Sequence, residues 1–234
     1  MKKVIVILVT IVIIAAGLLV IKNMNKETKK ESNIEVKTDA IKFKEEYESL
    51  NGQTNDNGKE YIHIDVDKEN PMKYSNYEEV MNILENGTGV IYFGFPECPW
   101  CRNAVPVLID AAQEMGIDTI YYFNALSIRD KKSLDESGNI VVEEDGTEEY
   151  KKLVETLYDV LTPYEGLNDE SIKRLYFPTV VYVKDGQILS STIGTVDSQD
   201  DPYVALTQDQ YNELKQIYMD GINSAYDILC DEAC

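Results

Sequence analysis

The chain has 234 residues and a formal net charge of −20, from 42 acidic and 22 basic residues. This charge excludes nucleic acid as a partner, because phosphate binding needs a basic face. It also disfavours adsorption on anionic lipid. The length allows one medium domain with accessory segments, and a hydrophobic fraction of 44% is ordinary for a folded core.

An apolar run without charges, residues 4–21, follows Lys2 and Lys3. As a helix it would extend about 27 Å, close to the hydrocarbon thickness of a bilayer. Its only cluster of small residues, 15–17, lies inside the run, which argues against a cleavage site. Residues 1–21 are therefore predicted to be an uncleaved signal anchor, with a cleaved signal peptide as the alternative. Lysines on both sides leave the positive-inside rule nearly balanced.

Residues 22–60 are rich in Lys, Glu, Asn and Thr and poor in large apolar side chains. Such a segment buries too little surface to offset the entropy lost on ordering. It is predicted to be a polar tether, with a short helix around residues 41–50. The folded domain is predicted to span residues 61–234.

From residue 61 the hydrophobic periodicity predicts elements in the order βαβαβαββα, an α/β domain with a central mixed sheet flanked by helices. Strands are expected over residues 61–66, 89–95 and 118–126, and a hairpin over residues 178–194 with its turn at Asp185 and Gly186. Helices are expected over residues 75–87 with Ser75 as N-cap, from the cysteine pair to Gly116, and over residues 147–161 and 207–229.

The stretch GFPECPWCRNAVPVL, residues 94–108, places Cys98 and Cys101 after a strand and at the start of a helix. Thiol–disulfide exchange needs an accessible thiolate with a lowered pKa. Unpaired N–H groups and the dipole at a helix start stabilise that anion. Pro99 suits the first turn because it has no N–H. Cys98 is therefore predicted to be the nucleophile, and Cys101, one turn deeper, the resolving thiol.

Three motifs occur in the order typical of one superfamily: FGFPECPWC, then Pro106 inside the following helix, then FPTVVYVKDGQILSSTIGTV. Over residues 61–225 the chain resembles the thioredoxin-like superfamily. The resemblance implies a cis-proline at Pro178 opposite the cysteine pair, with Phe177 offering its backbone to an extended peptide. Trp100 would lie beside the site as an apolar surface. No cofactor beyond the cysteines is implied.

Two departures from this resemblance stand out. Thioredoxin-type reductases carry a buried Asp six residues before the first cysteine, as proton acceptor, and Tyr92 occupies that position here. Glu97 or water are the candidate substitutes. The second departure is a polar insertion, residues 127–147, with a small hairpin expected around residues 140–142. It either shapes partner choice or is a solvated loop without a role.

Other uses of the cysteines remain as alternatives. A metal site needs four ligands, and the remaining candidates are Cys230, Cys234 and His63. Proline and tryptophan between Cys98 and Cys101 do not suit a zinc knuckle. A purely structural disulfide across so short a loop would contribute little stability.

The pair Cys230 and Cys234 lies four residues apart, on one face of a last helical turn. On an oxidising membrane face the pair is predicted to close a terminal disulfide, with a second redox relay as the alternative. Arg102 is expected to be a solvated surface residue, with electrostatic support of the thiolate as the alternative.

The sequence thus predicts a single-pass cell-membrane protein whose extracytoplasmic domain is a protein thiol–disulfide oxidoreductase. Its expected partners are cysteine-containing exported proteins and an upstream redox partner that resets it. A proline after the first cysteine, as Pro99 is here, is similar to oxidising motifs, whereas a tryptophan in the next position, Trp100, is not. The direction of electron flow therefore stays open. The alternative is a non-catalytic peptide-binding module, similar to the thioredoxin-like accessory proteins of bacteriocin export.

Overall fold

The computed structural model describes residues 39–228. The predicted signal anchor, residues 22–38 of the predicted tether, and Cys230 and Cys234 lie outside this range. Within it, no helix combines the length and the apolar character that crossing a bilayer requires.

Five strands form a central mixed sheet in the order β1-β3-β2-β6-β7. Both β1 and β2 run parallel to β3, whereas β6 runs antiparallel to β2 and β7 antiparallel to β6. The strands are β1 (Met72–Tyr74), β2 (Gly89–Phe93), β3 (Ile120–Phe123), β6 (Thr179–Lys184) and β7 (Gln187–Ile193). Strand β2 is buried along its whole length, which explains its continuous apolar run.

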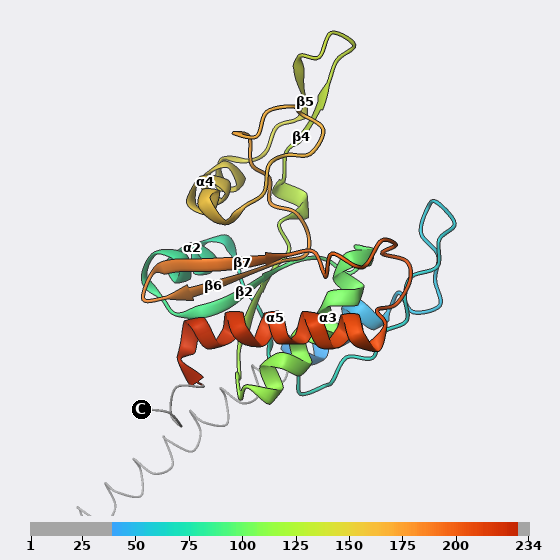
Figure 1. Ribbon diagram of the computed structural model, residues 1–234, viewed down its shortest axis with the longest axis vertical. Helices are drawn as coiled ribbons and strands as arrows, with labels where there is room; N and C mark the ends of the chain where they lie inside the picture. The colour runs from blue at the N-terminus through green and yellow to red at the C-terminus, as the bar shows by residue number, and fades with distance from the viewer. Residues whose placement is uncertain (1–38, 229–234) are drawn as a thin grey trace, which may run out of the picture.

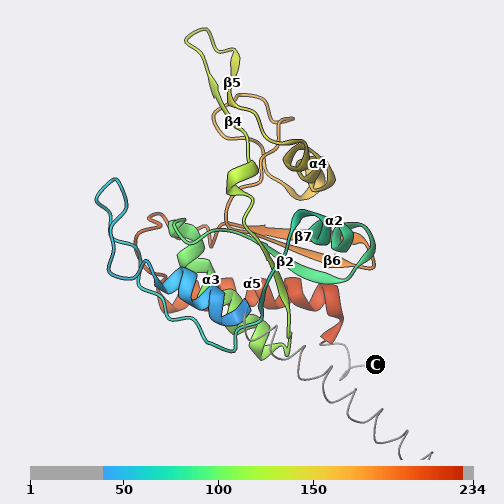
Figure 2. The ribbon, with the colours of Figure 1, turned by 180° about the vertical axis from the view of Figure 1, so that it is seen from behind.

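Helices cover both faces of this sheet (Figure 1). On one face lie α3 (Pro99–Glu114), α5 (Gln208–Tyr226) and a helix formed by residues 39–48. On the other lie α2 (Tyr77–Asn86) and α4 (Glu148–Thr156), as the reverse view also shows (Figure 2). Two 3₁₀ turns, η1 (Leu126–Ile128) and η2 (Tyr158–Val160), connect elements. The predicted α/β class, with a mixed sheet flanked by helices, is confirmed.

Local signals placed most helix starts and turns correctly. Thr207 caps α5 and forms a capping box with Gln210. The hairpin between β6 and β7 turns at Asp185 and Gly186, which have φ values of 50° and 73°. The expected cap of α2 is one residue off, because the side chain of Asn76, rather than Ser75, accepts a hydrogen bond from the Glu79 N–H at 2.8 Å.

The second half of the predicted tether is part of the folded domain. Ala40, Phe43 and Tyr47 project from one face of the helix of residues 39–48 and are buried. The Phe43 ring stacks on Tyr47 with centroids 4.4 Å apart and meets Tyr122 edge-on at 5.0 Å. The domain therefore extends upstream of the boundary predicted at residue 61.

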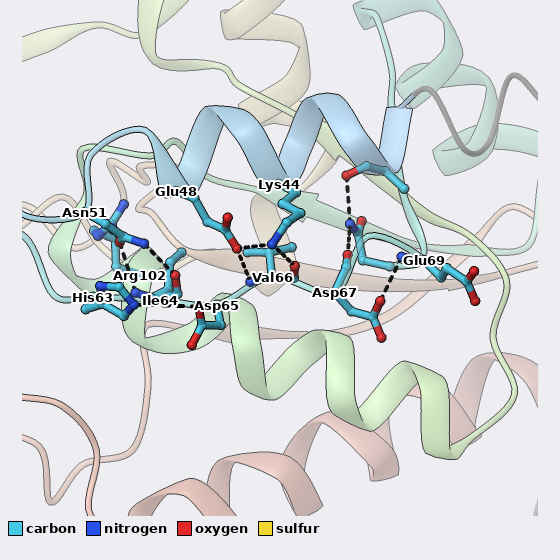
Figure 3. Close-up of polar contacts among 12 residues, drawn as sticks. Lys44, Glu48, Asn51, His63, Ile64, Asp65, Val66, Asp67, Glu69 and Arg102 are labelled. Carbon is cyan, nitrogen blue, oxygen red and sulfur yellow. Dashed lines mark hydrogen bonds and ion pairs between the residues drawn. The ribbon is translucent and has the colours of Figure 1, made fainter.

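Residues 61–66 are not a strand, contrary to the sequence prediction. Side chains from the preceding segment bond to this backbone in the place of a neighbouring strand (Figure 3). The Asn51 side chain exchanges two hydrogen bonds with the backbone of Ile64, at 2.8 and 3.1 Å. Glu48 accepts from the Val66 N–H at 2.7 Å, and Lys44 donates to the Val66 carbonyl at 2.8 Å. The alternation reflects burial of Ile64 and Val66 against the core, not sheet pairing.

The expected insertion contains the expected hairpin. Its strands β4 (Lys131–Leu134) and β5 (Ile140–Glu144) pair antiparallel and project away from the central sheet (Figure 1). Every residue of β5 is exposed. The α4 helix that follows returns to the domain, where Tyr150 and Leu153 are buried.

Replacing Phe43 by Ala tests whether residues 39–48 belong to the cooperative fold. Phe43 is 0% exposed, so the cavity should lower the free energy of unfolding by about 3–5 kcal/mol. Ile41 on the same helix is 45% exposed, and Ile41→Ala should change it by less than roughly 0.5 kcal/mol. Denaturant unfolding of both variants measures the difference. Equal stabilities would mean that this helix is a tether after all.

Candidate redox site

Cys98 is the N-cap of α3, and Pro99 occupies the first helical position. The Cys98 Sγ accepts a hydrogen bond from the Cys101 N–H at 3.3 Å, so an otherwise unpaired donor of the first turn bonds to the sulfur. Cys98 is 6% exposed, whereas Cys101 is 0% exposed. Both are free thiols. The pair therefore lies at the start of the helix, as the sequence predicts, with Cys98 nearly buried at the N-cap and Cys101 fully buried one turn deeper.

The environment separates the two thiols electrostatically. A hydrogen bond from the Cys101 side chain lowers the pKa of Cys98, and the backbone N–H groups of Cys101 and Trp100 lower it further. Burial opposes this shift but does not cancel it. The pKa of Cys101 is raised, first by burial and then by the neighbouring Cys98. One thiol is thus tuned to ionise and the other to keep its proton.

The FPT stretch lies directly against Cys98. The peptide bond between Phe177 and Pro178 is cis, and the Cys98 thiol donates to the Phe177 carbonyl at 3.5 Å. The Phe177 ring meets Phe95 edge-on at 5.3 Å. Trp100 is half-buried and packs on the apolar cluster that contains both cysteines. The fold therefore brings together all five predicted site residues within the described range: Cys98, Cys101, Trp100, Phe177 and Pro178.

Arg129 belongs to the site although no sequence signal marks it. It follows η1 at the start of the insertion, and its guanidinium lies 4.9 Å from the centroid of the Phe177 ring. Its charge helps to lower the pKa of Cys98. Burial, and then the nearby Arg174, lower the pKa of Arg129 itself. The insertion thus delivers positive charge to the nucleophile of an acidic protein.

Arg102 is not the solvated residue that the sequence predicts, because its side chain is fully buried. It ties the N-terminal segment to the start of α3 (Figure 3). Its guanidinium donates to the carbonyls of Ile62 and Tyr47, each at 2.8 Å, to the carbonyl of Pro96 at 3.3 Å and to Asn51 Oδ1 at 2.7 Å. Arg102 is therefore a structural clamp rather than a partner of the thiolate.

Tyr92 fills the position that the resemblance assigns to a buried Asp. Its side chain is 0% exposed, and its hydroxyl lies 2.9 Å from the hydroxyl of Tyr47. Glu97, the candidate substitute, is exposed on the loop before Cys98. The position that the resemblance assigns to a buried carboxylate thus holds a buried phenol.

Within residues 39–228, no three His, Cys, Asp or Glu side chains gather closely enough to hold a metal ion. His63 is exposed, and its Nε2 lies 3.6 Å from Asp65 Oδ1 (Figure 3). Helix α5 ends at Tyr226, ahead of Cys230 and Cys234. The terminal disulfide and the terminal relay therefore stay predictions.

Replacing Arg129 by Gln should raise the pKa of Cys98, because a nearby positive charge that favours the thiolate is lost. At a fixed pH the ratio of thiolate to thiol should fall about 1.4- to fivefold, since partly exposed charge pairs contribute roughly 0.2–1 kcal/mol. The pH dependence of Cys98 alkylation measures this. Arg129→Lys keeps the charge and should stay near the parent. Identical profiles for the Gln variant and the parent would remove Arg129 from the site.

Comparison with known proteins adds little to this geometry. No protein-family model matches the chain, and no curated protein matches it. Among solved structures, oxidized thioredoxin O2 from Arabidopsis thaliana is similar at 15% sequence identity, with a TM-score of 0.33. That match covers 64% of this chain and 96% of the thioredoxin. A likeness this distant carries no argument about function.

Proposed function

We propose that this protein is a thiol–disulfide oxidoreductase of the thioredoxin-like type. The observation that carries the proposal is the asymmetry of the CPWC pair. Cys98 caps a helix and has a lowered pKa, whereas Cys101 is buried and has a raised pKa. A dithiol that only braced a loop would not need one thiol tuned to ionise.

The reaction follows from this asymmetry. The Cys98 thiolate attacks a client disulfide, forms a mixed disulfide and expels one client sulfur as a thiolate. Cys101 then loses its proton to solvent and attacks Cys98 Sγ, which expels the second client thiolate. The product is a Cys98–Cys101 disulfide; the client has gained two electrons from the dithiol and takes up two protons from solvent. The same steps in reverse oxidise a client dithiol, so the redox partner sets the direction.

The surface around Cys98 suits an extended peptide as client. The Phe177 backbone borders the sulfur, and the rings of Phe95 and Trp100 are partly exposed beside it. Backbone hydrogen bonding and apolar contact need no particular client sequence. We propose cysteine-containing exported proteins as clients and an upstream redox partner that resets the couple.

The proposed location rests on the sequence alone. Residues 4–21 are long and apolar enough for a single span. We propose that they anchor the protein in the cell membrane, with residues 39–228 on the extracytoplasmic side, where disulfide exchange with exported proteins takes place.

Serine variants of the two cysteines test the proposed chemistry. The full chain should accelerate insulin reduction by dithiothreitol, and Cys98→Ser should return the rate to the uncatalysed value, because it removes the nucleophile. Cys101→Ser should lose turnover and accumulate mixed disulfides on non-reducing gels, because no resolving thiol remains. Both variants are made with Cys230→Ser and Cys234→Ser, so that the terminal cysteines cannot capture clients.

Two outcomes would overturn this assignment in different ways. Equal activity of Cys98→Ser and the parent would favour the non-catalytic peptide-binding module. Capture of clients through Cys101 but not Cys98 would mean that nucleophile and resolving thiol are inverted.

Fractionation of cells tests the anchor. The intact chain should sediment with membranes, because residues 4–21 would remain in the bilayer. Protease added from outside should release a fragment that begins before residue 39, where the described fold starts. Recovery of a soluble protein that lacks the apolar run would show a cleaved signal peptide instead.

A further inference from the structure

Two of the three arginines of the chain lie in the region of the redox site without a carboxylate partner. The third, Arg102, has the four oxygen acceptors described above. No ion pair joins Arg129 or Arg174 to an acidic side chain within residues 39–228, although the chain has 42 acidic residues. Charges that are partly removed from water are normally paired, so two unpaired guanidinium groups in one place point to an anionic ligand.

The Arg129 guanidinium lies over the ring of the residue that borders the nucleophile. It is 4.9 Å from the centroid of the Phe177 ring, and the Phe177 carbonyl accepts from the Cys98 thiol at 3.5 Å. The contact with the ring uses the charge of the guanidinium but not its N–H donors. Arg129 is partly exposed, and its side chain makes no hydrogen bond to another described residue. Its donors are therefore available to a ligand bound beside Cys98.

Arg174 is held close to Arg129 by contacts of its own. Its Nη2 donates to the carbonyl of Asp130, the residue after Arg129, at 3.3 Å. Its guanidinium lies 4.2 Å from the centroid of the Tyr164 ring. Its Nε is buried and has no hydrogen-bond partner among the described residues. Arg174 thus adds a second positive charge in a fixed position, which, after burial, is the next cause of the lowered pKa of Arg129.

The acidic side chain next to Arg129 in the sequence, Asp130, is paired with a lysine instead. Asp130 Oδ2 lies 2.7 Å from Lys132 Nζ, and Asp130 Oδ1 is buried without a hydrogen-bond partner in the described part of the chain. The neighbouring Lys131 pairs with Glu143 at 2.6 Å. Both lysines at the start of the insertion therefore have a carboxylate in contact, whereas the two arginines do not.

A carboxylate from the client matches this pair of cations. A guanidinium presents parallel N–H donors that bind the two oxygens of a carboxylate at once. An extended client that runs past the Phe177 backbone would advance about 3.3 Å per residue. While its cysteine is at Cys98, side chains a few residues away along the client are therefore within reach of Arg129.

We propose that Arg129, with Arg174 beside it, binds an acidic side chain that lies within about three residues of the reactive cysteine of the client. This inference rests on the proposed function and adds a preference to a surface that otherwise needs no particular client sequence. Arg129 contacts the client carboxylate, whereas Arg174 is a positioning residue that acts through its charge and its contact with the Asp130 backbone. The insertion thereby takes part in the choice of client.

The test compares two peptides that differ only in charge near the cysteine. Each is a symmetric disulfide dimer whose cysteine is flanked on both sides by Glu in one peptide and by Gln in the other. The reduced full chain, with Cys230→Ser and Cys234→Ser, is oxidised by each dimer. Trp100, the only tryptophan, lies between the two cysteines, so its fluorescence can report the reaction. Each rate constant is divided by that for reduction of the same dimer by dithiothreitol, which removes differences in intrinsic reactivity.

The parent chain should prefer the acidic peptide about two- to fivefold, the range expected of partly exposed ion pairs. Arg129→Gln should abolish the preference, and Arg129→Lys should keep part of it, because the charge remains and the paired donors do not. Any change in the reactivity of Cys98 affects both peptides and cancels in their ratio. Lys131→Gln is the matched control, since it removes an equal charge that already pairs with Glu143, and it should keep the parental preference.

Equal rates of the parent with the two peptides would overturn the inference and leave the proposed function standing, because exchange itself would have been observed. A preference that survives Arg129→Gln, or that Lys131→Gln removes to the same extent, would overturn it as well. Should Arg129→Gln fail to fold, Arg174→Gln has to weaken the preference, and an unchanged preference would count against the inference. A parent that reacts with neither peptide would refute the proposed function, and the inference would fall with it.

Discussion

The N-terminal turn of α3, closed over the sulfur of Cys98, is the contact on which the site depends. Its first N–H groups have no partner within the helix. With a cysteine at the N-cap, one of these N–H groups donates a hydrogen bond to the sulfur and stabilises a thiolate there. The rest of the site is arranged around this sulfur. Strand β2 leads into the loop that carries Cys98. From the segment before β6, the Phe177 carbonyl accepts a hydrogen bond from the Cys98 thiol. The resolving thiol follows one turn later because the helix continues through Cys101.

The buried Arg102 connects this turn to a segment far away in the sequence. Its acceptors are three carbonyls and one amide oxygen, so the guanidinium is satisfied without a carboxylate partner. Removing the guanidinium would leave several buried acceptors without a hydrogen-bond partner, which lowers the stability of the fold. Because the Tyr47 carbonyl is among its acceptors, Arg102 holds the N-terminal helix against the start of α3.

Patterns that depend on neighbours in sequence were predictable, and those that depend on distant contacts were not. The continuous apolar run of residues 89–95 predicted β2, and the sequence motifs predicted the places of Cys98 and Pro178. The short helix expected around residues 41–50 is present over residues 39–48, but its place in the folded core was not predicted. Ala40, Phe43 and Tyr47 are spaced for one helical face, yet the polar composition around them outweighed three residues. The alternation of apolar and polar side chains in residues 61–66 indicates which of them are buried. It does not distinguish backbone hydrogen bonds to a neighbouring strand from backbone hydrogen bonds to side chains, which are the ones present. Arg129 reaches the site only through tertiary structure.

Local charge, rather than the charge of the whole chain, governs the nucleophile. A net charge of −20 would by itself oppose ionisation of a thiol. Exposed charges are screened beyond about 8 Å at physiological ionic strength, however, whereas groups in contact with a buried sulfur are screened much less. Cys98 is bonded to helix N–H groups and to the Cys101 thiol, and Arg129 adds its positive charge. The acidic surface can thus keep the protein soluble while the site stays suited to a thiolate. The cation comes from Arg129 at the start of the insertion, because the stretch FGFPECPWC that holds the two cysteines contains no Lys or Arg.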